Sequence, residues 1–225
     1  MQPAEGYRYS MDPFWLCSQV PSVCSGDRIL DIGCGCGIIP VILGYCFPQS
    51  HITGIEIQTE LAEIALKNVI KNNLEQTVSI MNQDIKTINP ESAGGPFDLI
   101  LSNPPYKKQN TGRLNPDTQK AIARHEITMD IQVLALKAET LLRHKGRLMI
   151  IFPFERLIDI RNAVQSTSIN PEWIRYIYTA QEKPPKRVVF SGRKDISAPN
   201  RTLSPIYLSP RDMMDLNILP KRIIP

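Results

Sequence analysis

A strand, a glycine loop and a helix follow one another near the start of the chain, and they constrain its fold more than any other feature. The apolar run Arg28–Ile32 predicts a buried strand, and the run from Ile38 to Tyr45 predicts a helix. Three glycines alternate with cysteines in the loop between them. This order forms the first part of a nucleotide-binding βαβ unit, so the sequence predicts an α/β protein with a parallel sheet.

The rest of the chain continues this alternation. Further strands are expected at residues 51–56, 77–81, 97–101, 147–152, 172–179, 187–191 and 203–208, and helices at 14–20, 59–72, 127–143 and 154–166. Asp12 is expected to cap the helix at 14–20, with Pro13 in its first turn. Gly146 is expected to end the helix at 127–143. We therefore expect a Rossmann-like sheet with helices on both faces.

The length and composition fit one main domain. The 225 residues are 42% apolar, which is enough for a substantial core. The longest apolar run, Ile38 to Phe47, is too short to span a membrane, and no basic segment followed by an apolar one begins the chain. We expect a cytoplasmic protein with a lid segment at 1–27, the main domain at 28–210 and a tail at 211–225.

The spacing of the glycines indicates which cofactor the loop binds. A dinucleotide fingerprint needs its third glycine at position 38, where this chain has Ile38. The loop instead contains Gly33, Gly35 and Gly37, and it follows Asp31, whose charge would repel a pyrophosphate. S-adenosylmethionine carries a positively charged amino-acid end and no phosphate, so we expect it to be the cofactor.

Two further carboxylates follow the next two predicted strands. Glu56 ends the strand at 51–56 and is placed to accept hydrogen bonds from both hydroxyls of a ribose. Asp84 follows the strand at 77–81 and, with Ile85, suits an adenine amine and its ring. Open α/β sheets bind ligands at the carboxyl ends of their strands, where these acids and Asp31 are expected to meet.

The motif Asn103-Pro104-Pro105-Tyr106 follows the predicted strand at 97–101. The two prolines end the strand because neither can donate to a β-ladder, and they stiffen the turn. The Asn103 side-chain oxygen and the Pro104 carbonyl can accept both hydrogens of an NH2 group, while the Tyr106 ring stacks on a flat target. The motif therefore favours an exocyclic amine of a nucleobase, or a planar amide, as the group that reacts.

Basic residues gather beside this motif and in the C-terminal part of the chain. Residues 181–225 contain nine basic and four acidic residues, a net charge of +5 against +4 for the whole chain. Such clusters beside a base-binding site favour a nucleic-acid partner. The residues expected to contact it are Lys107, Lys108, Arg113, Arg124, Lys186, Arg187, Arg193 and Lys194.

The cysteines indicate neither a metal site nor a disulfide framework. There are five, none of them in a Cys-x-x-Cys pair, and the three histidines lie far from them in sequence. We expect reduced thiols and no bound metal.

The residues quoted above resemble those of class I S-adenosylmethionine-dependent methyltransferases of the small-domain type that carry an Asn-Pro-Pro-Tyr motif. The resemblance covers roughly Gly6 to Leu208. It implies a seven-stranded, mostly parallel sheet whose last strand is antiparallel. Segments 6–10, 124–126 and 185–188 resemble the bacterial members that methylate N6 of adenine in tRNA. RNA, and tRNA in particular, is therefore the implied partner of a protein that we expect to be a monomer.

The resemblance also implies which residues act. Those implied to bind the cofactor are Asp31, Gly33, Gly35, Gly37, Glu56, Ile57, Asp84, Ile85, Asn103, Tyr9 and Ser10. The catalytic residues are implied to be Asn103, Pro104, Pro105 and Tyr106. Residues 191–201 are longer and more polar than the final hairpin of the family, and the tail at 212–225 has no counterpart in it.

Other functions remain open at this point. Relatives with the same motif methylate the N5 of glutamine in proteins, the N2 of guanine in rRNA, or adenine in DNA. The glutamine enzymes carry a helical domain before the glycine loop, whereas 32 residues precede Gly33 here. The DNA enzymes usually carry a separate recognition domain. A non-catalytic RNA-binding protein with the same fold is the remaining alternative, against which Asp31, Glu56 and Asn103 argue because each stands where the chemistry needs it.

Overall fold

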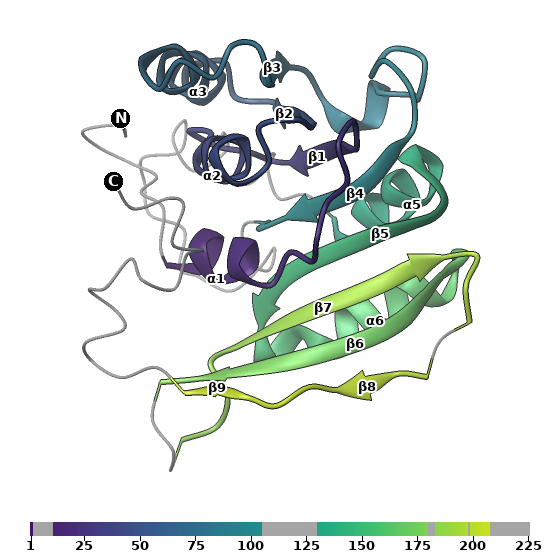
Figure 1. The fold of residues 1–225 in the computed structure, drawn as a ribbon. Coiled ribbons are helices and arrows are strands. Elements are labelled where there is room, and N and C mark those ends of the chain that lie inside the picture. Colours follow the sequence, from purple (N-terminus) through teal and green to yellow (C-terminus); the bar gives the residue numbers. More distant parts are fainter. Residues whose placement is uncertain (2–10, 105–129, 180–182, 198, 208–225) are drawn as a thin grey trace, which may run out of the picture.

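The computed structural model describes residues 1, 11–104, 130–179, 183–197 and 199–207 (Figure 1). Its strands are β1 Arg28–Ile32, β2 His51–Glu56, β3 Val78–Asn82, β4 Phe97–Ser102, β5 Leu142–Pro153, β6 Ile169–Tyr178, β7 Arg187–Lys194, β8 Arg201–Thr202 and β9 Ile206–Tyr207. Its helices are α1 Asp12–Ser18, α2 Ile38–Cys46, α3 Thr59–Lys71, α5 Ile131–Leu141 and α6 Leu157–Gln165, with 3-10 turns η1 Ile85–Thr87 and η2 Phe154–Arg156. Helices therefore alternate with strands along most of the chain.

The described strands form one sheet in the order β3-β2-β1-β4-β5-β7-β6-β8, and β9 also pairs with β6. Strands β1 to β5 pair in parallel with their neighbours, and β7 lies antiparallel between β5 and β6. The expected seven-stranded sheet with an antiparallel last strand is confirmed for β1 to β7. The two short strands β8 and β9 extend it beyond β6.

The prediction of a single strand at 203–208 is wrong for the residues that the structure describes. Two two-residue strands, β8 and β9, run parallel to β6 instead, and Pro205 lies between them. Proline has no amide hydrogen to donate, so the ladder is interrupted before Ile206.

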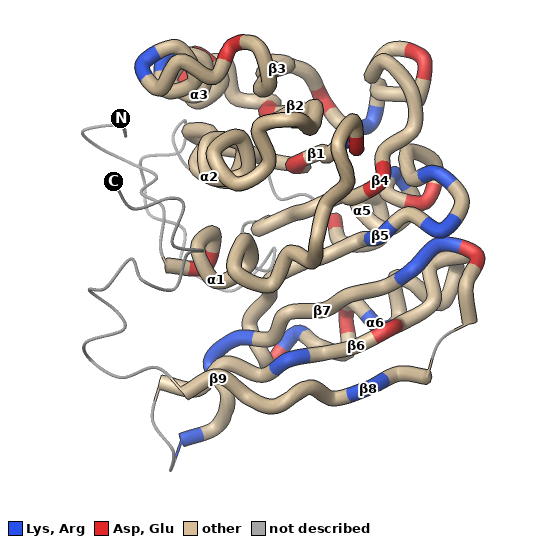
Figure 2. Tube along the Cα trace, viewed as in Figure 1, with Lys and Arg blue, Asp and Glu red and all other residues tan. Residues whose placement is uncertain are grey.

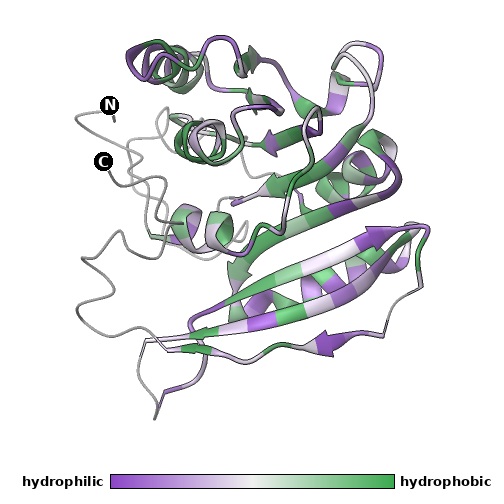
Figure 3. Ribbon diagram, in the orientation of Figure 1, coloured by the Kyte–Doolittle hydropathy of each residue, from purple (hydrophilic) through white to green (hydrophobic). Residues whose placement is uncertain are grey.

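The sheet is covered on both faces by helices, as expected. Helices α1, α2 and α3 pack on one face, and α5 and α6 pack on the other (Figure 1). Strands β1, β4 and β5 lie between the two layers and are apolar along most of their length, whereas β6 and β7 alternate more in hydropathy (Figure 3). Strands buried on both faces have this continuous apolar character.

Helix α1 joins the core on the α2 side. Phe14, Trp15 and Leu16 are all buried there. The prediction that Asp12 caps this helix is wrong, because the helix begins at Asp12 and the cap position is Met11. The Asp12 carboxylate, with only 3% of its side chain exposed, instead accepts a hydrogen bond from Arg187 Nε at 3.0 Å.

The helix expected at 127–143 is observed as α5, which ends at Leu141; residues 127–129 lie outside the described part of the chain. The prediction that Gly146 ends this helix is wrong, because Gly146 lies inside β5. A Cβ atom at Gly146 would stand 2.9 Å from the Arg143 carbonyl oxygen and 3.0 Å from that of Phe97. Glycine is therefore required by a close approach of backbones where β5 begins beside β4.

The Asp12–Arg187 pair gives a first prediction. Arg187→Ala would leave the Asp12 carboxylate buried without this partner, and we expect a loss of about 3 kcal/mol in the free energy of unfolding. The matched control is Lys186→Ala, since Lys186 is exposed and its loss should change stability by less than about 0.5 kcal/mol. Urea unfolding of the three proteins measures both values, and equal stability of the two variants would contradict this account.

Candidate functional site

The predicted site residues lie at the edge of the sheet where β1, β2 and β4 end, which we call the carboxyl edge. Strands β1 and β4 are neighbours although about 70 residues separate them, and the connections from them lead to opposite faces of the sheet. Ligands of open α/β sheets bind at such a switch point. The buried Ser102 hydroxyl donates to the Ile32 carbonyl at 2.8 Å, so the end of β4 is fixed against the end of β1.

The glycine loop lies on β2 and α3. Its glycines at positions 33, 35 and 37 have φ values of 76°, 55° and 81°, a region that other residues rarely adopt. The Gly33 amide donates to the Ile55 carbonyl at 2.9 Å. A Cβ atom at Gly37 would stand 3.0 Å from the Cβ of Ala65. The third glycine of the motif therefore lets the start of α2 pack closely on α3.

Glu56 is the last residue of β2, and its carboxylate holds the glycine loop in place. It is only 5% exposed, and its two carboxylate oxygens accept from the Gly35 amide at 2.8 Å and the Gln58 amide at 2.9 Å. Each carboxylate oxygen has further acceptor capacity. The Glu56 side chain is therefore held in one orientation and can still accept hydrogen bonds from a ribose.

Two asparagines that the sequence analysis missed support these loops. Asn82, the last residue of β3, donates from Nδ2 to the carbonyls of Glu56 at 2.9 Å and Ile57 at 3.2 Å. Asn68 in α3 is buried, accepts from the Met1 ammonium group and donates to the Cys36 carbonyl at 2.8 Å. For Asn68, the sequence signal was a polar residue on the buried face of an amphipathic helix.

Asp31 is the most unusual residue of the site. Its side chain is completely buried, and neither carboxylate oxygen has a hydrogen-bond partner among the residues that the structure describes. Burial, and then the charge of Glu56, raise the pKa of Asp31 well above its ordinary value. A buried charge without a partner is costly, so this carboxylate is suited to a cationic ligand group. The ammonium group of S-adenosylmethionine fits this requirement.

Asp84 stands between β3 and η1, and Ile85 is the first residue of η1. The Asp84 carboxylate caps η1 by accepting from the Lys86 amide at 2.9 Å, and its second oxygen is not used in this bond. Ile85 is 5% exposed and belongs to the core. Ile57, by contrast, is 47% exposed directly after Glu56, which is unusual for a large apolar residue beside a strand end. These positions match the expected adenosine side of the site, and their roles stay predictions.

The amine-binding motif begins where β4 ends. Asn103 is half-buried and Pro104 is buried, both directly after Ser102. The structure thus brings Asn103 to the same edge as Asp31 and Glu56. The predicted site residues that lie outside the described part of the chain are Pro105, Tyr106, Tyr9, Ser10, Lys107, Lys108, Arg113 and Arg124.

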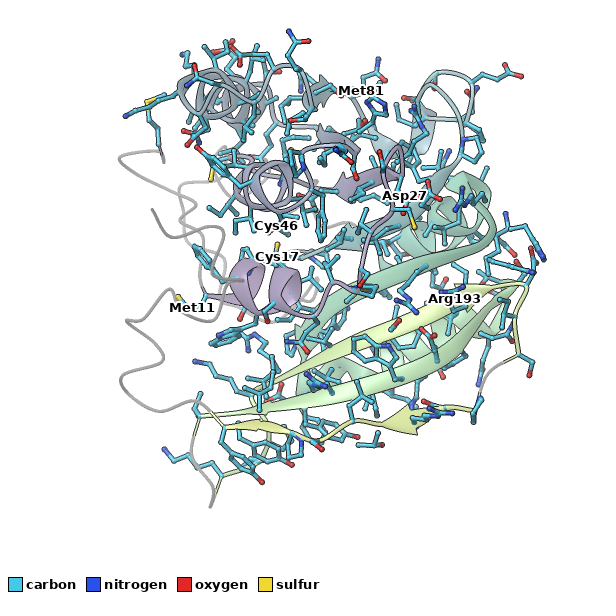
Figure 4. All side chains as sticks on the ribbon, in the orientation of Figure 1. Met11, Cys17, Asp27, Cys46, Met81 and Arg193 are labelled. Carbon is cyan, nitrogen blue, oxygen red and sulfur yellow. The ribbon has the colours of Figure 1, made fainter. Side chains whose placement is uncertain are left out.

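The four basic residues predicted on β7 and just before it do not form one cluster. Lys186 and Arg187 stand at the start of β7, on the carboxyl edge. Arg193 and Lys194 stand at its other end, at the opposite edge of the sheet (Figures 2 and 4). Lys194 Nζ donates to the carbonyls of Glu139 and Leu142 at 2.7 and 2.8 Å. The structure therefore brings only Lys186 and Arg187 near the site.

Four cysteines lie on α1, on α2 or in the glycine loop: Cys17, Cys34, Cys36 and Cys46. Cys17 and Cys46 lie near one another where α1 packs on α2 (Figure 4). Burial raises the pKa values of Cys17, Cys34 and Cys36, and raises that of Cys46 to about 11.

Among the described residues there is no group of three or more histidine, cysteine or acidic side chains that could hold a metal. None of the described helices is long and apolar enough to cross a membrane.

Comparison with known proteins gives consistent results. Residues 15–164 match a family model described as the methyltransferase small domain. A tRNA1(Val) (adenine(37)-N6)-methyltransferase from Porphyromonas gingivalis is 36% identical over 178 residues, which make up 78% of this chain and 69% of that protein. A protein of the same name from a Flavobacteriaceae bacterium is 28% identical over 198 residues, 87% of this chain and 82% of that protein.

Solved structures show the same fold. The crystal structure of a predicted O-methyltransferase from Agrobacterium tumefaciens has a TM-score of 0.72 to this chain. It covers 92% of this chain and 95% of that one at 19% identity, so the likeness concerns the fold alone.

Asp31 gives the second prediction. In the ligand-free protein its raised pKa means that its contribution to stability is largest below the ordinary aspartate pKa and declines as the pH rises through the raised value. Asp31→Asn removes the charge but keeps the shape. We therefore expect this variant to have a higher Tm at pH 7 and to bind S-adenosylmethionine about 1.5–3 kcal/mol more weakly.

Thermal unfolding at several pH values and calorimetry check this prediction. The control is Asp195→Asn at the opposite edge, where a hydrogen bond from His144 lowers the pKa of the carboxyl. Its loss should not raise Tm and should leave cofactor binding unchanged. A lower Tm for Asp31→Asn would mean that the buried carboxylate has a stabilising partner in the ligand-free protein.

Glu56 gives the third prediction. Glu56→Ala removes the acceptor for two backbone amides and for the ribose, so we expect S-adenosylmethionine binding to weaken by about 1–3 kcal/mol and Tm to fall. The control is Glu63→Ala, an exposed carboxylate on α3 that should change neither value. Calorimetry that finds equal affinities for the two variants would exclude Glu56 as a cofactor ligand.

Proposed function

We propose that this chain, which belongs to the methyltransferase small-domain family, transfers a methyl group from S-adenosylmethionine to N6 of an adenine in tRNA. Membership of the family makes the protein an S-adenosylmethionine-dependent methyltransferase. The observation that carries the choice of an amine is the juxtaposition of Asn103 and Pro104 with the glycine loop across the β1–β4 pair. The names of the similar proteins support adenine 37 of tRNA1(Val) as the target.

The polar groups at the end of β4 suit an exocyclic amine. The lone pair of such an amine is conjugated into the ring, which makes the nitrogen a poor nucleophile. Two acceptors, the Asn103 side-chain oxygen and the Pro104 carbonyl, would hold both hydrogens and direct the lone pair away from the ring. Pro104 is buried and Ser102 is bonded to Ile32, so these acceptors are held in place before the substrate binds.

The cofactor would supply the electrophilic methyl group on a sulfonium centre. The chain's own contribution would be to bind and orient. Asp31 would face the ammonium group, the glycine loop would surround the methionine part, Glu56 would hold the ribose, and Asp84 with Ile85 would hold the adenine. A cofactor held by Asp31 and an amine held by Asn103 would then meet at the switch point between β1 and β4.

A direct transfer without a covalent enzyme intermediate fits the thiols of this chain. Cys34 and Cys36, the cysteines of the glycine loop, are buried, and burial raises their pKa values. A thiol is a nucleophile only as the thiolate, so these groups are poor candidates at neutral pH. Positioning and desolvation would then supply most of the acceleration, and the amine would lose its proton after it becomes positively charged.

The assembly state and location follow from the same proposal. We propose that the protein acts as a monomer, and gel filtration would check this. A tRNA substrate places the reaction in the cytoplasm.

The experiment that tests the function is a methyl-transfer assay on tRNA from a strain that lacks this gene. We expect the purified protein to add one methyl group to an adenine, and nucleoside mass spectrometry to identify N6-methyladenosine in the valine tRNA. A methyl group on guanine N2 of rRNA or on a protein glutamine would instead assign one of the alternative amine substrates.

Asn103→Ala gives the fourth prediction. Loss of the side-chain acceptor should lower kcat roughly a hundredfold or more, because the interaction orients the reacting nitrogen. Calorimetry should find S-adenosylmethionine binding little changed. The control is Asn200→Ala, an exposed asparagine near β8 that should keep full turnover. Near-normal turnover of Asn103→Ala on the true substrate would refute the amine-binding role, whatever the fold.

A further inference from the structure

An aromatic pair stands on the carboxyl edge, away from the cofactor residues. Tyr178 ends β6 and Tyr207 ends β9, and the two are paired in register. Their rings are stacked, with centroids 5.0 Å apart and planes inclined by 24°. Strand β6 runs in the same direction as β5, since β7 is antiparallel to both. The ends of β6 and β9, which carry the two tyrosines, therefore lie on the edge where β4 ends (Figure 1).

Tyr207 offers a large aromatic surface to solvent. It is 49% exposed although one of its faces lies on Tyr178, so the exposed part comprises the rest of the ring and the hydroxyl. Large aromatic side chains usually bury most of their area, because that burial provides their stabilising effect. An exposed, already stacked ring is a prepared surface for one further flat group.

Tyr207 is not needed to hold β9 on the sheet, because other residues do this. Ile206 packs against the core beneath α1, and the register of Ile206 with Ile177 places it beside β6. The Leu203 amide donates to the Ile174 carbonyl at 2.9 Å, which fixes the chain just before β9. The segment is therefore held by residues other than Tyr207.

The charge around the pair suits a polyanion. Lys183 and Lys186 are both exposed in the connection from β6 to β7, on the same edge as the tyrosines. Arg187 is paired with Asp12, so it already has a structural partner. Two exposed cations on the same edge as a stacked pair with one exposed ring form the combination by which proteins bind single-stranded nucleic acid.

The sheet geometry fixes how far this pair lies from the reacting centre. Ser102, Ile150, Phe190 and Ile174 stand at one level across β4, β5, β7 and β6. Three strand spacings and about three residues of β6 then separate Asn103 from Tyr178, which gives roughly 15–20 Å. This is too far for contact with the target base and within reach of a nucleotide a few positions away.

We propose that the Tyr178–Tyr207 pair is a stacking platform for an unpaired base that flanks the target adenine in the RNA substrate, with Lys183 and Lys186 contacting the adjoining phosphates. The proposal rests on the proposed function, because it takes the substrate to be RNA. It assigns to the β8–β9 extension of the sheet a part in substrate binding. It also explains why an additional short strand carries its aromatic ring outward.

The test measures RNA binding by variants of Tyr207 with two probes: an unmodified transcript of valine tRNA, and decaadenylate as a single-stranded RNA. Tyr207→Ala should weaken binding of both by roughly five- to a hundredfold, the effect of losing one base–aromatic stack. Tyr207→Phe keeps the ring and should bind like the wild type. Tyr207→Leu keeps an apolar contact with Tyr178 but has no aromatic face, so it should behave like the alanine variant.

The matched control is Tyr45→Ala. Tyr45 is 43% exposed near the end of α2, at the opposite edge of the sheet, and its loss should leave RNA affinity unchanged. Thermal unfolding and S-adenosylmethionine binding of each variant report whether the fold and the cofactor site are intact. In turnover, Tyr207→Ala should raise KM for tRNA far more than it lowers kcat, because the platform lies away from the reacting atoms.

Salt dependence separates stacking from charge. Tyr207→Ala should shift the plot of log Kd against log salt concentration without changing its slope. Lys186→Ala should reduce the slope for decaadenylate by about 0.7, the value for one phosphate contact on a single strand. A change of slope in Tyr207→Ala would mean that the ring acts through the charges rather than by stacking.

The two proposals fail in different ways. If the wild type transfers no methyl group to tRNA, the proposed function fails, while decaadenylate still reports on the platform directly. If the wild type methylates tRNA and Tyr207→Ala binds both probes as tightly as Tyr45→Ala does, the platform is excluded and the function stands. Equal weakening by Tyr207→Ala and Tyr207→Phe would also overturn the platform, because the phenylalanine ring can stack.

Discussion

The pairing of β1 with β4 is the constraint on which the rest of the site depends. Residues far apart in sequence, the glycine loop and the Asn103 segment, meet only because these two strands are neighbours. The hydrogen bond from Ser102 to the Ile32 carbonyl fixes the two strand ends together at 2.8 Å. Because connections from the two strands lead to opposite faces of the sheet, no helix in the described part of the chain covers this point. In the proposed function, the cofactor lies at the end of β1 and the reacting amine at the end of β4, on the two sides of this point.

The carboxylates of Glu56 and Asp31, both at this edge, differ in their hydrogen bonding, and this difference suits them to different ligand groups. Glu56 accepts hydrogen bonds from two backbone amides, so its orientation is fixed in the ligand-free protein. Asp31 receives none among the described residues, and its burial raises its pKa. Glu56 is thus pre-oriented, as its proposed role as an acceptor for neutral ribose hydroxyls requires. In Asp31 the charged form is the costly one, and either protonation or a bound cation relieves that cost, so the protein's stability and its affinity for a cationic ligand are linked at this residue.

The sequence predicted the parallel sheet and the carboxyl-edge site because both depend on local patterns. The run Arg28–Ile32, the glycine spacing and the acid after β2 each carry their meaning within a few residues. The errors arose where a partner distant in sequence decides the outcome. Asp12 looks like a helix cap by its neighbours, but Arg187 at the start of β7 takes its carboxylate. Gly146 looks like a helix stop, but the approach of the Phe97 carbonyl from β4 is what requires it.

The same limit explains the supporting residues that were missed and the charges that were grouped wrongly. Asn68 and Asn82 act on carbonyls of other segments, so only the folded chain identifies their partners. The basic residues at the two ends of β7 are close in sequence, yet a strand of eight residues carries Lys186 and Lys194 to opposite edges of the sheet. For these four residues, the charge counted along the sequence therefore overestimates the charge at the carboxyl edge. Among the described residues, the carboxyl edge combines the exposed Lys183 and Lys186 with the aromatic surface of the Tyr178–Tyr207 stack. A surface of that kind gains more from the flat faces of unpaired bases than from the phosphates of a duplex, so an RNA whose target adenine lies in a loop suits this edge better than a regular helix does.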